Sequence, residues 1–508
     1  MRRCCSLPLC VALLASACGA APGATGHAGG VEPRHSHQVA GTLSRPPSAA
    51  ALAPAERLPA VGHYAVVVSR KTLADHRWKK VCATLVRRYE AKLVTWADDV
   101  AGARPHLAKA MPNYTCFVAR PDECGRNFVV AVHRLTRRLD ADPYTDTLWG
   151  ILTGCDAADA ARIAATDGPL VLKKVLSGTT GGKTGPFDAG AVFDEGKAGR
   201  MRAKAPGGSW EEKGCPDDST KAIVDYLNNE KPDAFITSGH ATQRDWQIGY
   251  SYKDGQLRCK DGQLFGRDTK GGRFDIRSPN PKVFLPVGNC LIGDVPGRDC
   301  MVTALIRTGG VVQMFGYTVP TWYGVGGWGI QDIFLGQPGR WTLAEAFFVN
   351  TQAMLHEIRT RFPKSAGVNF GRYDLEKRRG LLAELRAKHG ITDRDELGLL
   401  WDRDTVAFYG NPALDARPVR RDLAWDQTLT VEGNRYTLTL KATRSGSWPS
   451  KPVFALLPHR IANPKVIEGG DHPPVVTDNF VLVPLVGGFS TGGQVTIVFN
   501  AARAAASK

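Results

Sequence analysis

Short apolar runs along the middle of the chain alternate with longer amphipathic stretches. The first run, His63–Ser69, is rich in β-branched residues, and helical periodicity follows over Leu73–Lys92, which predicts a strand and then a helix. Further strands are predicted at Thr115–Ala119, Leu170–Leu176, Ala234–Ser238, Lys282–Val287 and Val311–Phe315. Buried parallel strands have continuous apolar sequences of this kind, because helices cover both faces of the sheet. The pattern therefore predicts an α/β domain with a mostly parallel sheet flanked by helices.

A different pattern begins after Pro418. Residues Thr428–Thr443 alternate between apolar and polar side chains, with a turn at Glu432–Asn434. More short strands are predicted at Val453–Leu457, Phe480–Leu485 and Gln494–Phe499. Short strands separated by turn residues are typical of a β-sandwich. Residues 420–508 are therefore predicted to form a second, C-terminal β domain.

The N-terminal residues have the features of an export signal. Arg2 and Arg3 precede the apolar run Leu7–Leu14, which is too short to span a bilayer, and small residues follow it as at a cleavage site. We therefore predict a signal peptide at residues 1–17. Cys18 directly follows the small residues, as in the lipobox of bacterial lipoproteins. Lipidation of Cys18 and plain export both remain open.

Either outcome places the chain outside the cytoplasm, in the periplasm, at the cell surface or in the secreted fraction. Residues 18–60 are rich in Ala, Pro and Gly and have no hydrophobic period, which predicts a flexible tether. If Cys18 is lipidated, a lipid anchor would attach this tether to the membrane.

Composition excludes several classes of protein. The 508 residues are 43% hydrophobic and 22% charged, which argues against wholesale disorder, a collagen-like fibre and a polytopic membrane protein. The 65 Lys and Arg residues outnumber the 49 Asp and Glu residues, giving a net charge of +16, but net charge alone names no partner. Arg134, Arg137 and Arg138 fall on a helix predicted at Phe128–Leu139, and no series of aromatic residues accompanies them. We interpret them as a solvated basic face and expect no nucleic-acid partner.

Neither a metal nor a cofactor is predicted. Four of the 12 cysteines belong to the export signal and its junction, and the other eight show neither a Cys-x-x-Cys pair nor the Cys/His spacing of a zinc site. Ser177–Thr184 is similar to a phosphate-binding P-loop, but Ser177 replaces the first glycine and no helix is predicted after the segment. We interpret residues 177–220 as a mobile, loop-rich insertion.

Two of the predicted strands end in small residues followed by a reactive side chain. Asp233–Gly239 leads to His240, and Lys282–Asn289 leads to Cys290. Ligands collect at the carboxyl ends of parallel strands, so two strands lying near each other would bring these side chains to one edge of the sheet. There the His240 imidazole would accept the proton of the Cys290 thiol, and the thiolate would attack an acyl carbon. The backbone amides of Cys290 and of the loop after His240 would stabilise the oxyanion.

Three stretches of the chain resemble the gingipain family of cysteine peptidases, which share a caspase-like fold. They are the apolar strand ending in Ser238–His240, the segment Gly288–Asp294 with the following Ala304–Gly310, and the segment Ala407–Leu414. The last is similar to the stretch that closes the catalytic domain of the family, after which an immunoglobulin-like domain tends to follow. The resemblance implies a caspase-like catalytic domain at residues 61–419 and an immunoglobulin-like β-sandwich at residues 420–508.

The resemblance also implies roles for single residues. Cys290 would be the nucleophile, His240 the general base, and the amides of Cys290 and Ala241 the oxyanion donors. Asp294 would be either an acidic determinant for Lys or Arg in the substrate or a helix cap. Three aromatic residues fall in a region that borders the substrate pocket of caspase-like folds, although ordinary packing explains them equally well: Trp322, Tyr323 and Trp328.

Two hypotheses follow for the function. The leading one is an exported, gingipain-type cysteine endopeptidase that acts on a protein or peptide substrate through a Cys290 thiolate and a His240 base. The alternative is a catalytically inactive caspase-like module that binds a protein or a cell-envelope polymer. Ala241 favours the alternative, because the family usually has glycine after the histidine and alanine resists positive φ angles. The pair of Cys290 and His240 favours the enzyme.

Overall fold

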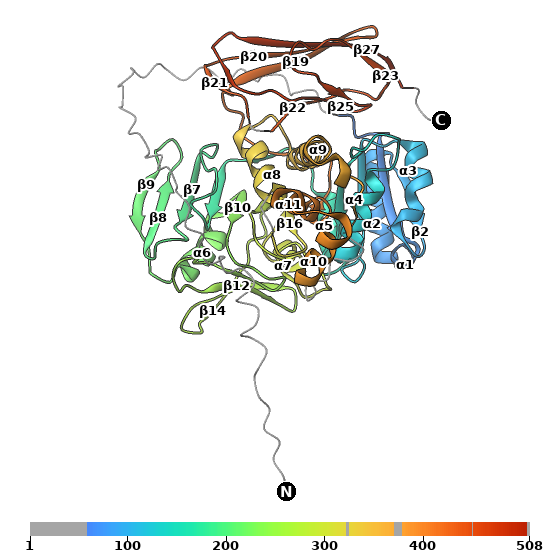
Figure 1. The fold of residues 1–508 in the computed structure, drawn as a ribbon. Coiled ribbons are helices and arrows are strands. Elements are labelled where there is room, and N and C mark those ends of the chain that lie inside the picture. The colour runs from blue at the N-terminus through green and yellow to red at the C-terminus, as the bar shows by residue number, and fades with distance from the viewer. Residues whose placement is uncertain (1–57, 322–324, 370–377, 450, 505–508) are drawn as a thin grey trace. The chain divides into compact units, whose positions relative to one another are not determined.

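The computed structural model describes residues 58–321, 325–369, 378–449 and 451–504 (Figure 1). The chain divides into two units, Met1–Pro54 and Ala55–Lys508. The predicted signal peptide, Cys18 and nearly all of the predicted tether lie outside the described residues. In the part of the chain that is described, no helix combines the length and the apolar character needed to cross a membrane.

A twelve-stranded sheet forms the centre of the folded unit (Figure 1). In spatial order its strands are β2 (Lys92–Trp96), β1 (Tyr64–Ser69), β3 (Tyr114–Val118), β4 (Leu148–Leu152), β17 (Val406–Gly410), β16 (Val311–Tyr317), β15 (Lys282–Pro286), β10 (Ala234–Thr237), β6 (Lys174–Ser177), β7 (Ala189–Phe193), β8 (Arg200–Lys204) and β9 (Glu211–Gly214). The pairs from β2 to β17 and from β16 to β7 all run parallel. Strands β16 and β17 pair antiparallel, as do β7 with β8 and β8 with β9. The sheet therefore consists of two parallel halves that meet at one antiparallel junction.

Helices pack against this sheet along most of its width. They are α1 (Arg70–Ala74), α2 (His76–Tyr89), α3 (Arg104–Ala110), α4 (Arg126–Thr136), α5 (Ala157–Ala165), α6 (Thr220–Asp225), α7 (Met301–Arg307), α8 (Val325–Gly336), α9 (Leu343–Arg361), α10 (Arg378–His389) and α11 (Arg394–Asp402). Helix α9 begins with a capping box, in which Thr342 and Glu345 each accept a hydrogen bond from the amide of the other residue. Helix α9 then contacts both β4 and β16, so it covers the junction between the two parallel halves.

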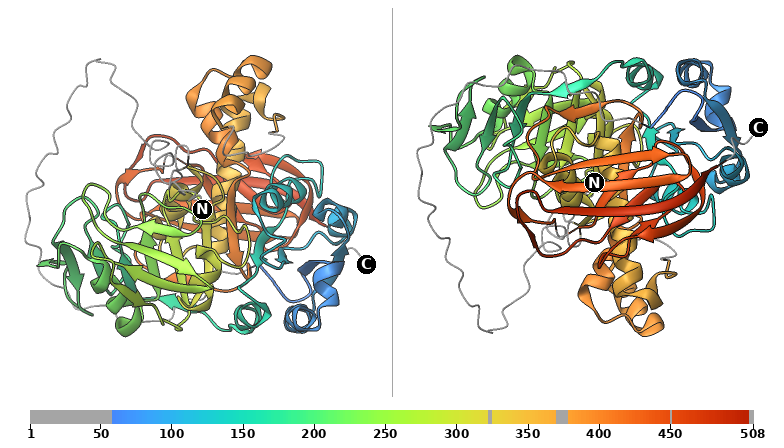
Figure 2. Two further views of the ribbon diagram at one scale, coloured as in Figure 1. Left: turned by 90° about the horizontal axis from the view of Figure 1, so that it is seen from below. Right: turned by 90° about the horizontal axis from the view of Figure 1, so that it is seen from above.

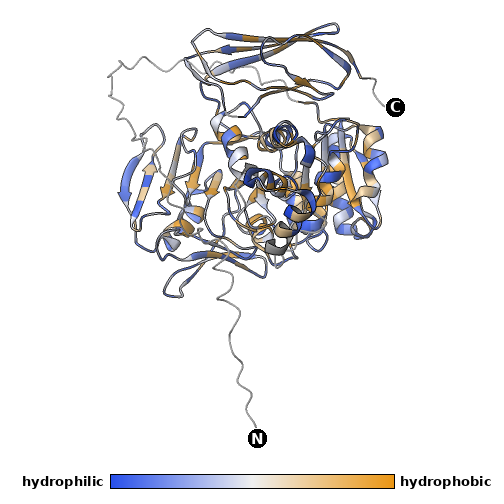
Figure 3. Ribbon diagram, viewed as in Figure 1, coloured by the Kyte–Doolittle hydropathy of each residue, from blue (hydrophilic) through white to orange (hydrophobic). Residues whose placement is uncertain are grey.

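Burial explains why the central strands are apolar along their whole length. Every residue of β1, β3, β4, β15, β16 and β17 is buried, and Figure 3 shows the central strands as largely hydrophobic. The edge strand β9 is exposed throughout and mostly hydrophilic (Figure 3). A polar edge strand discourages pairing with another chain.

The C-terminal β domain consists of antiparallel strands (Figure 2, right). One sheet contains β19 (Trp425–Glu432), β20 (Arg435–Ala442), β27 (Gln494–Arg503) and β23 (Ile461–Glu468). The second contains β22 (Val453–Leu456), β25 (Phe480–Val483) and β24 (Val475–Val476), and β21 (Gly446–Ser447) pairs with β26 (Gly488–Phe489).

Strands β22 and β25 contribute to two hydrophobic cores at once. Val481 and Val483 belong to the core of the β domain, whereas Phe480 and Leu482 belong to the core around the large sheet. The Phe480 ring makes an edge contact with Tyr144, at 5.3 Å between ring centroids. Successive side chains of a strand point to opposite faces, so one sheet can be packed on both sides. The β domain is therefore joined to the α/β domain through a continuous apolar contact.

The mostly parallel sheet with flanking helices, followed by antiparallel sheets, confirms the predicted fold class and is consistent with a caspase-like fold plus a β-sandwich. The sequence did not predict two parts of it. The segment 177–220, expected as a mobile loop, contains β7, β8 and β9, of which β8 and β9 have few apolar residues. A separate antiparallel sheet forms from β11 (Asp245–Gln247), β12 (Gln256–Lys260), β13 (Gln263–Arg267) and β14 (Arg273–Asp275).

The predicted strand Leu170–Leu176 also differs in the structure. It is divided into β5 (Leu170–Leu172) and β6, and β5 pairs instead with β18 (Ala416–Pro418). Asp233 causes the break, because its carboxylate accepts hydrogen bonds from the amides of Lys173 and Lys174, both at 2.8 Å. An apolar run alone does not reveal such a side-chain contact with the backbone.

Candidate active site

Strands β10 and β15 bring His240 and Cys290 to the same edge of the large sheet. The two strands are parallel neighbours, with Thr237 opposite Pro286, and the amide of Val287 donates to the carbonyl of Thr237 at 2.7 Å. His240 follows the end of β10, and Cys290 follows the end of β15. The two side chains thus lie on neighbouring loops at the carboxyl ends of parallel strands, where ligands of such sheets bind.

Asn289 links these two loops through its side-chain amide. The side chain is fully buried. Its Oδ1 accepts a hydrogen bond from Thr237 Oγ1 at 2.8 Å, and its Nδ2 donates to the carbonyl of Gly239 at 3.0 Å. Gly239 has a φ of 86°, a conformation that residues with a Cβ rarely adopt. Asn289 therefore fixes the backbone next to His240 from the position next to Cys290.

The Cys290 sulfur lies against a segment that follows β16. Its Sγ is 3.4 Å from Thr321 Oγ1 and accepts a hydrogen bond from the Thr321 amide at 3.3 Å. The side chain is buried, with 8% of its surface exposed. An N–H group that donates to sulfur stabilises the charge of a thiolate. The Thr321 amide is therefore placed to favour the nucleophilic form of Cys290.

Three further hydrogen bonds hold the segment that carries Thr321. Trp401 Nε1 donates to the carbonyl of Pro320 at 3.0 Å, and the Thr318 amide donates to the carbonyl of Thr405 at 2.8 Å. The amide of Leu291 donates to the carbonyl of Val319 at 3.1 Å. The end of α11 and the start of β17 thereby support the backbone that surrounds the cysteine.

The His240 ring is stacked on an exposed tyrosine. The ring centroids of His240 and Tyr250 are 5.3 Å apart, with an angle of 27° between the planes, and Tyr250 is 57% exposed. The amide of Tyr250 donates to the carbonyl of Glu195 at 2.7 Å, and the amide of Gln247 donates to the carbonyl of His240 at 2.9 Å. These contacts fix the loop on both sides of the imidazole while leaving the ring half-buried.

Ala241 fits its position without backbone strain. It is absent from the non-glycine residues with positive φ in the described part of the chain, and the positive φ of this loop falls on Gly239 instead. Ala241 lies opposite Trp246 in an isolated antiparallel bridge, whose hydrogen bonds join the flanking residues rather than these two. The bridge therefore leaves the Ala241 amide available, and its role as an oxyanion donor remains a prediction.

Trp328 packs over the cysteine loop. A Cβ added to Gly288 would lie 3.1 Å from the Trp328 indole nitrogen, and one added to Gly181 would lie 3.2 Å from the ring. Trp328 is 37% exposed, so it forms part of the surface beside Cys290. The other two aromatic candidates, Trp322 and Tyr323, lie outside the described residues.

Asp294 interacts with an arginine of the chain itself. Its side chain is almost completely buried, and its carboxylate pairs with Arg126 at 2.9 Å. Burial raises the pKa of Asp294, and the nearby Arg126 guanidinium opposes this rise. Arg126 also donates to the carbonyl of Thr318 at 2.7 Å. This geometry supports a structural link to the Thr318 segment more than it supports recognition of a basic substrate side chain.

The P-loop-like segment contacts a carboxylate. Thr179 Oγ1 and the Thr180 amide both donate to the Glu195 carboxylate at 2.6 Å. Lys183 in the same segment pairs with Asp332 of α8 at 2.8 Å. The segment therefore connects α8 with Glu195, whose carbonyl contacts Tyr250 in the loop after His240. Sequence reasoning did not identify Thr321, Tyr250 or Glu195 as neighbours of the site, because no motif marks them.

Four aspartates outside this site form a group that could hold a metal ion. One carboxylate oxygen from each of Asp140, Asp142, Asp146 and Asp478 lies within 4.8 Å of the others. Oxygen ligands of this kind suit Ca²⁺, but Arg460 already pairs with Asp478, and an acidic cluster alone does not identify an ion. The spacing of the first three aspartates is visible in the sequence. The fourth comes from the β domain and is brought there only by folding.

The aspartate cluster predicts that stability falls as the pH rises. Burial, with the charge of Asp140, raises the pKa of Asp146 to about 9, and burial raises the pKa of Asp142 to about 6. A carboxyl group whose pKa is raised in the folded state binds its proton more tightly in the folded protein than in the unfolded chain. Folding stability is therefore lost from about pH 4 upwards through the folded-state pKa.

Asp146→Asn should weaken this pH dependence, because asparagine does not ionise. The substitution is conservative, since the asparagine oxygen can still accept the hydrogen bond that the Leu139 amide donates at 2.9 Å. Each tenfold change in proton affinity corresponds to about 1.4 kcal/mol, so the variant should gain stability over the native protein between pH 5 and pH 9. Thermal unfolding across this range measures the gain. Asp471→Asn, at an exposed site in the β domain, is the control. Parallel unfolding curves for native protein and Asp146→Asn would contradict the prediction.

The fold and the geometry define an α/β protein with a cysteine and a histidine on adjoining loops at one sheet edge. Neither a protein-family model nor a curated protein matches the chain. A comparison with solved structures found the complex of the pro- and mature domains of RgpB, a gingipain of Porphyromonas gingivalis, covering 87% of this chain and 99% of that chain. The sequence identity is 11% and the TM-score 0.38, which assigns the chain to no family.

Proposed function

We propose that this protein is an exported cysteine endopeptidase of the gingipain type. The observation that carries the proposal is the delivery of His240 and Cys290 to one sheet edge by the parallel neighbours β10 and β15, with Asn289 joining their loops. The donation from the Thr321 amide to Cys290 Sγ supports a nucleophilic sulfur. Protein or peptide chains are the proposed substrates, and the periplasm, the cell surface or the extracellular medium is the proposed location, with Cys18 as a proposed lipid attachment site.

The proposed reaction is acyl transfer to the Cys290 thiolate. His240 accepts the thiol proton, and the thiolate attacks the carbonyl carbon of the scissile peptide bond. The amides of Cys290 and Ala241 stabilise the oxyanion of the tetrahedral intermediate. The C–N bond then breaks, and the imidazolium returns its proton to the departing amine. Water, deprotonated by His240, hydrolyses the thioester and releases the acid and the free thiol.

Labelling with a thiol-directed peptidyl probe tests this proposal. We expect the folded protein to be labelled and Cys290→Ala to lose all labelling. Cys215→Ala is the matched control, because Cys215 is the most accessible of the eight cysteines in the described part of the chain. The other seven are buried. Cys215→Ala should be labelled like the native protein.

Labelling that depends on Cys215 instead of Cys290 would mean that the probe reacts with any accessible thiol. Folded native protein that remains unlabelled at Cys290 would favour the alternative of an inactive module that binds a protein or a cell-envelope polymer. Either result would overturn the peptidase proposal.

A further inference from the structure

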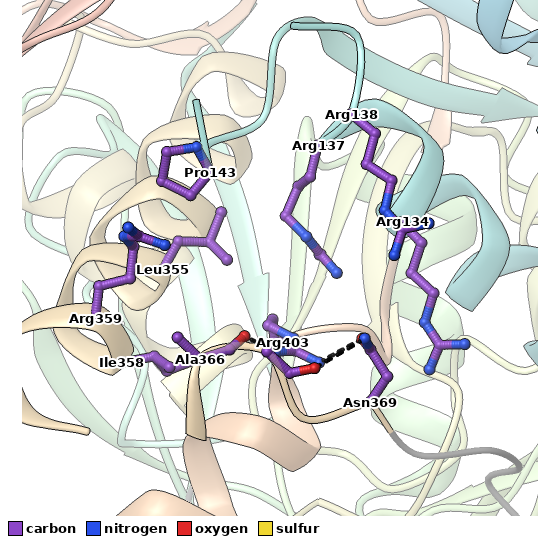
Figure 4. A pocket seen from close by; sticks show the side chains of 11 residues that line it. Arg134, Arg137, Arg138, Pro143, Leu355, Ile358, Arg359, Ala366, Asn369 and Arg403 are labelled. Carbon is purple, nitrogen blue, oxygen red and sulfur yellow. Dashed lines mark hydrogen bonds between the residues drawn. The ribbon is translucent and has the colours of Figure 1, made fainter. Parts of the chain in front are cut away.

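A cavity lined by five arginines lies between the end of α4, helix α9 and the turn before β17 (Figure 4). Its volume is about 220 Å³. The arginines are Arg134, Arg137, Arg138, Arg359 and Arg403. Figure 4 shows Arg359 on one side of the cavity and Arg134, Arg137 and Arg138 on the other, with Arg403 and Asn369 at its base. We call this cavity the arginine pocket.

The arginine pocket corrects the interpretation of Arg134 and Arg137 as parts of a solvated face. The Arg137 side chain is only 10% exposed and that of Arg134 is 26% exposed. Helix α4 ends at Thr136, so these arginines lie at a helix C-terminus, where the carbonyl groups favour cations. The sequence showed the spacing of the arginines, but not the cavity formed when α9 packs opposite them.

One buried carboxylate pairs with three of the arginines that line the arginine pocket. Asp404 is fully buried and pairs with Arg137 at 2.7 Å, with Arg403 at 3.2 Å and with Arg134 at 3.8 Å. Burial alone would raise the pKa of Asp404, but the Arg137 and Arg403 guanidinium groups lower it below its usual range. The carboxylate is therefore ionised and pairs with all three guanidinium groups.

The remaining positive charge lies on the rim. Arg138 and Arg359 are exposed, and neither has an ion-pair partner among the described residues. Among the described residues that line the arginine pocket, none has an acidic side chain. Burial lowers the pKa of the nearby His133 to about 4, so this histidine is neutral and adds no charge. The arginine pocket thus places five guanidinium groups, two of them on the exposed rim, around a small volume.

We propose that the arginine pocket binds a small oxyanion, either free phosphate or sulfate or the same group on a small molecule. Guanidinium groups form paired hydrogen bonds with phosphate oxygens and match their geometry better than lysine does. The volume is below the range of about 300–1,000 Å³ that is usual for drug-sized ligands, so one tetrahedral anion fits the space better than a nucleotide. Leu355 and Ile358 of α9 line the same space and offer an apolar surface to a short carbon chain.

Titration calorimetry at constant ionic strength tests this proposal on the full chain. Inorganic phosphate, sulfate and O-phosphoserine are the probes, and chloride is the reference anion. We expect saturable binding of one anion per chain. The double variant Arg138→Gln/Arg359→Gln should weaken it by tenfold or more, because charge-assisted hydrogen bonds to both rim arginines are lost. Both residues are exposed, so the variant should fold normally.

A second double variant controls for net charge. Arg77→Gln/Arg435→Gln removes the same total charge at exposed positions elsewhere and should leave the affinity within about twofold. Tighter binding of O-phosphoserine than of phosphate would identify an organic ester as the ligand, and equal binding would identify the free ion. Equal weakening in the two double variants would overturn the proposal. Binding to anionic lipid vesicles without binding of the small anions would also overturn it.

Discussion

Replacing His240 by alanine should lower kcat/KM for peptide hydrolysis by about 10²–10⁴, the range that a positioned general base contributes. Without the imidazole, neither the removal of the Cys290 proton nor the protonation of the leaving amine is assisted. The His240 ring is half-buried and packs on the exposed Tyr250, so its loss should leave the fold intact. Hydrolysis of internally quenched peptides, measured from pH 5 to pH 9, gives the loss in rate.

The pH profile distinguishes loss of the base from a general disturbance of the site. If the general base is lost, the pH dependence of the native rate should change in shape in His240→Ala, whereas a general disturbance of the site should lower the rate equally at every pH. Added imidazole should restore part of the rate. His472→Ala, in the β domain, is the matched control and should have the native profile. A His240→Ala rate within threefold of native would exclude His240 as the base.

The sequence predicted that His240 and Cys290 lie at one sheet edge because local composition reflects strand position in a parallel sheet. The apolar runs before His240 and Cys290 are buried on both faces in β10 and β15, and their carboxyl ends necessarily lie at one edge once the strands are parallel neighbours. The neighbour relationship itself was not predictable. The order β16–β15–β10–β6 depends on how the helices pack, which no single run of residues records.

Other parts of the site depend on contacts between residues far apart in the chain. Glu195, Tyr250 and Thr321 reach the site from three separate segments, and only Tyr250 is in a stretch close to one of the two proposed catalytic residues. Asn289 was visible as the residue before the cysteine, yet its contact with Thr237 on another strand was not. Polar networks of this kind are set by tertiary geometry, whereas helices and buried strands follow from local periodicity.

Replacing Asn289 by alanine should reduce both stability and turnover. The fully buried Thr237 hydroxyl and the half-buried Gly239 carbonyl would each lose a hydrogen-bond partner, and a buried group left unsatisfied costs about 1–3 kcal/mol. The loop next to His240 would then be free to move away from the Cys290 loop. A displacement of about 1 Å can lower a rate about 100-fold, so kcat should fall by roughly tenfold to 100-fold with little change in KM.

Thr237→Val separates positioning from stability, because it removes one partner of Asn289 and keeps the other. If Asn289 acts through both loops, Thr237→Val should lose less activity than Asn289→Ala, and the two substitutions together should not be additive, with an interaction energy above about 0.5 kcal/mol. Thermal unfolding gives the stability of each variant, and kcat is compared at a temperature where all are folded. A destabilised Asn289→Ala with native kcat would show that Asn289 only stabilises the fold. A fall in kcat at this temperature would show that the position of the two loops relative to each other contributes to catalysis.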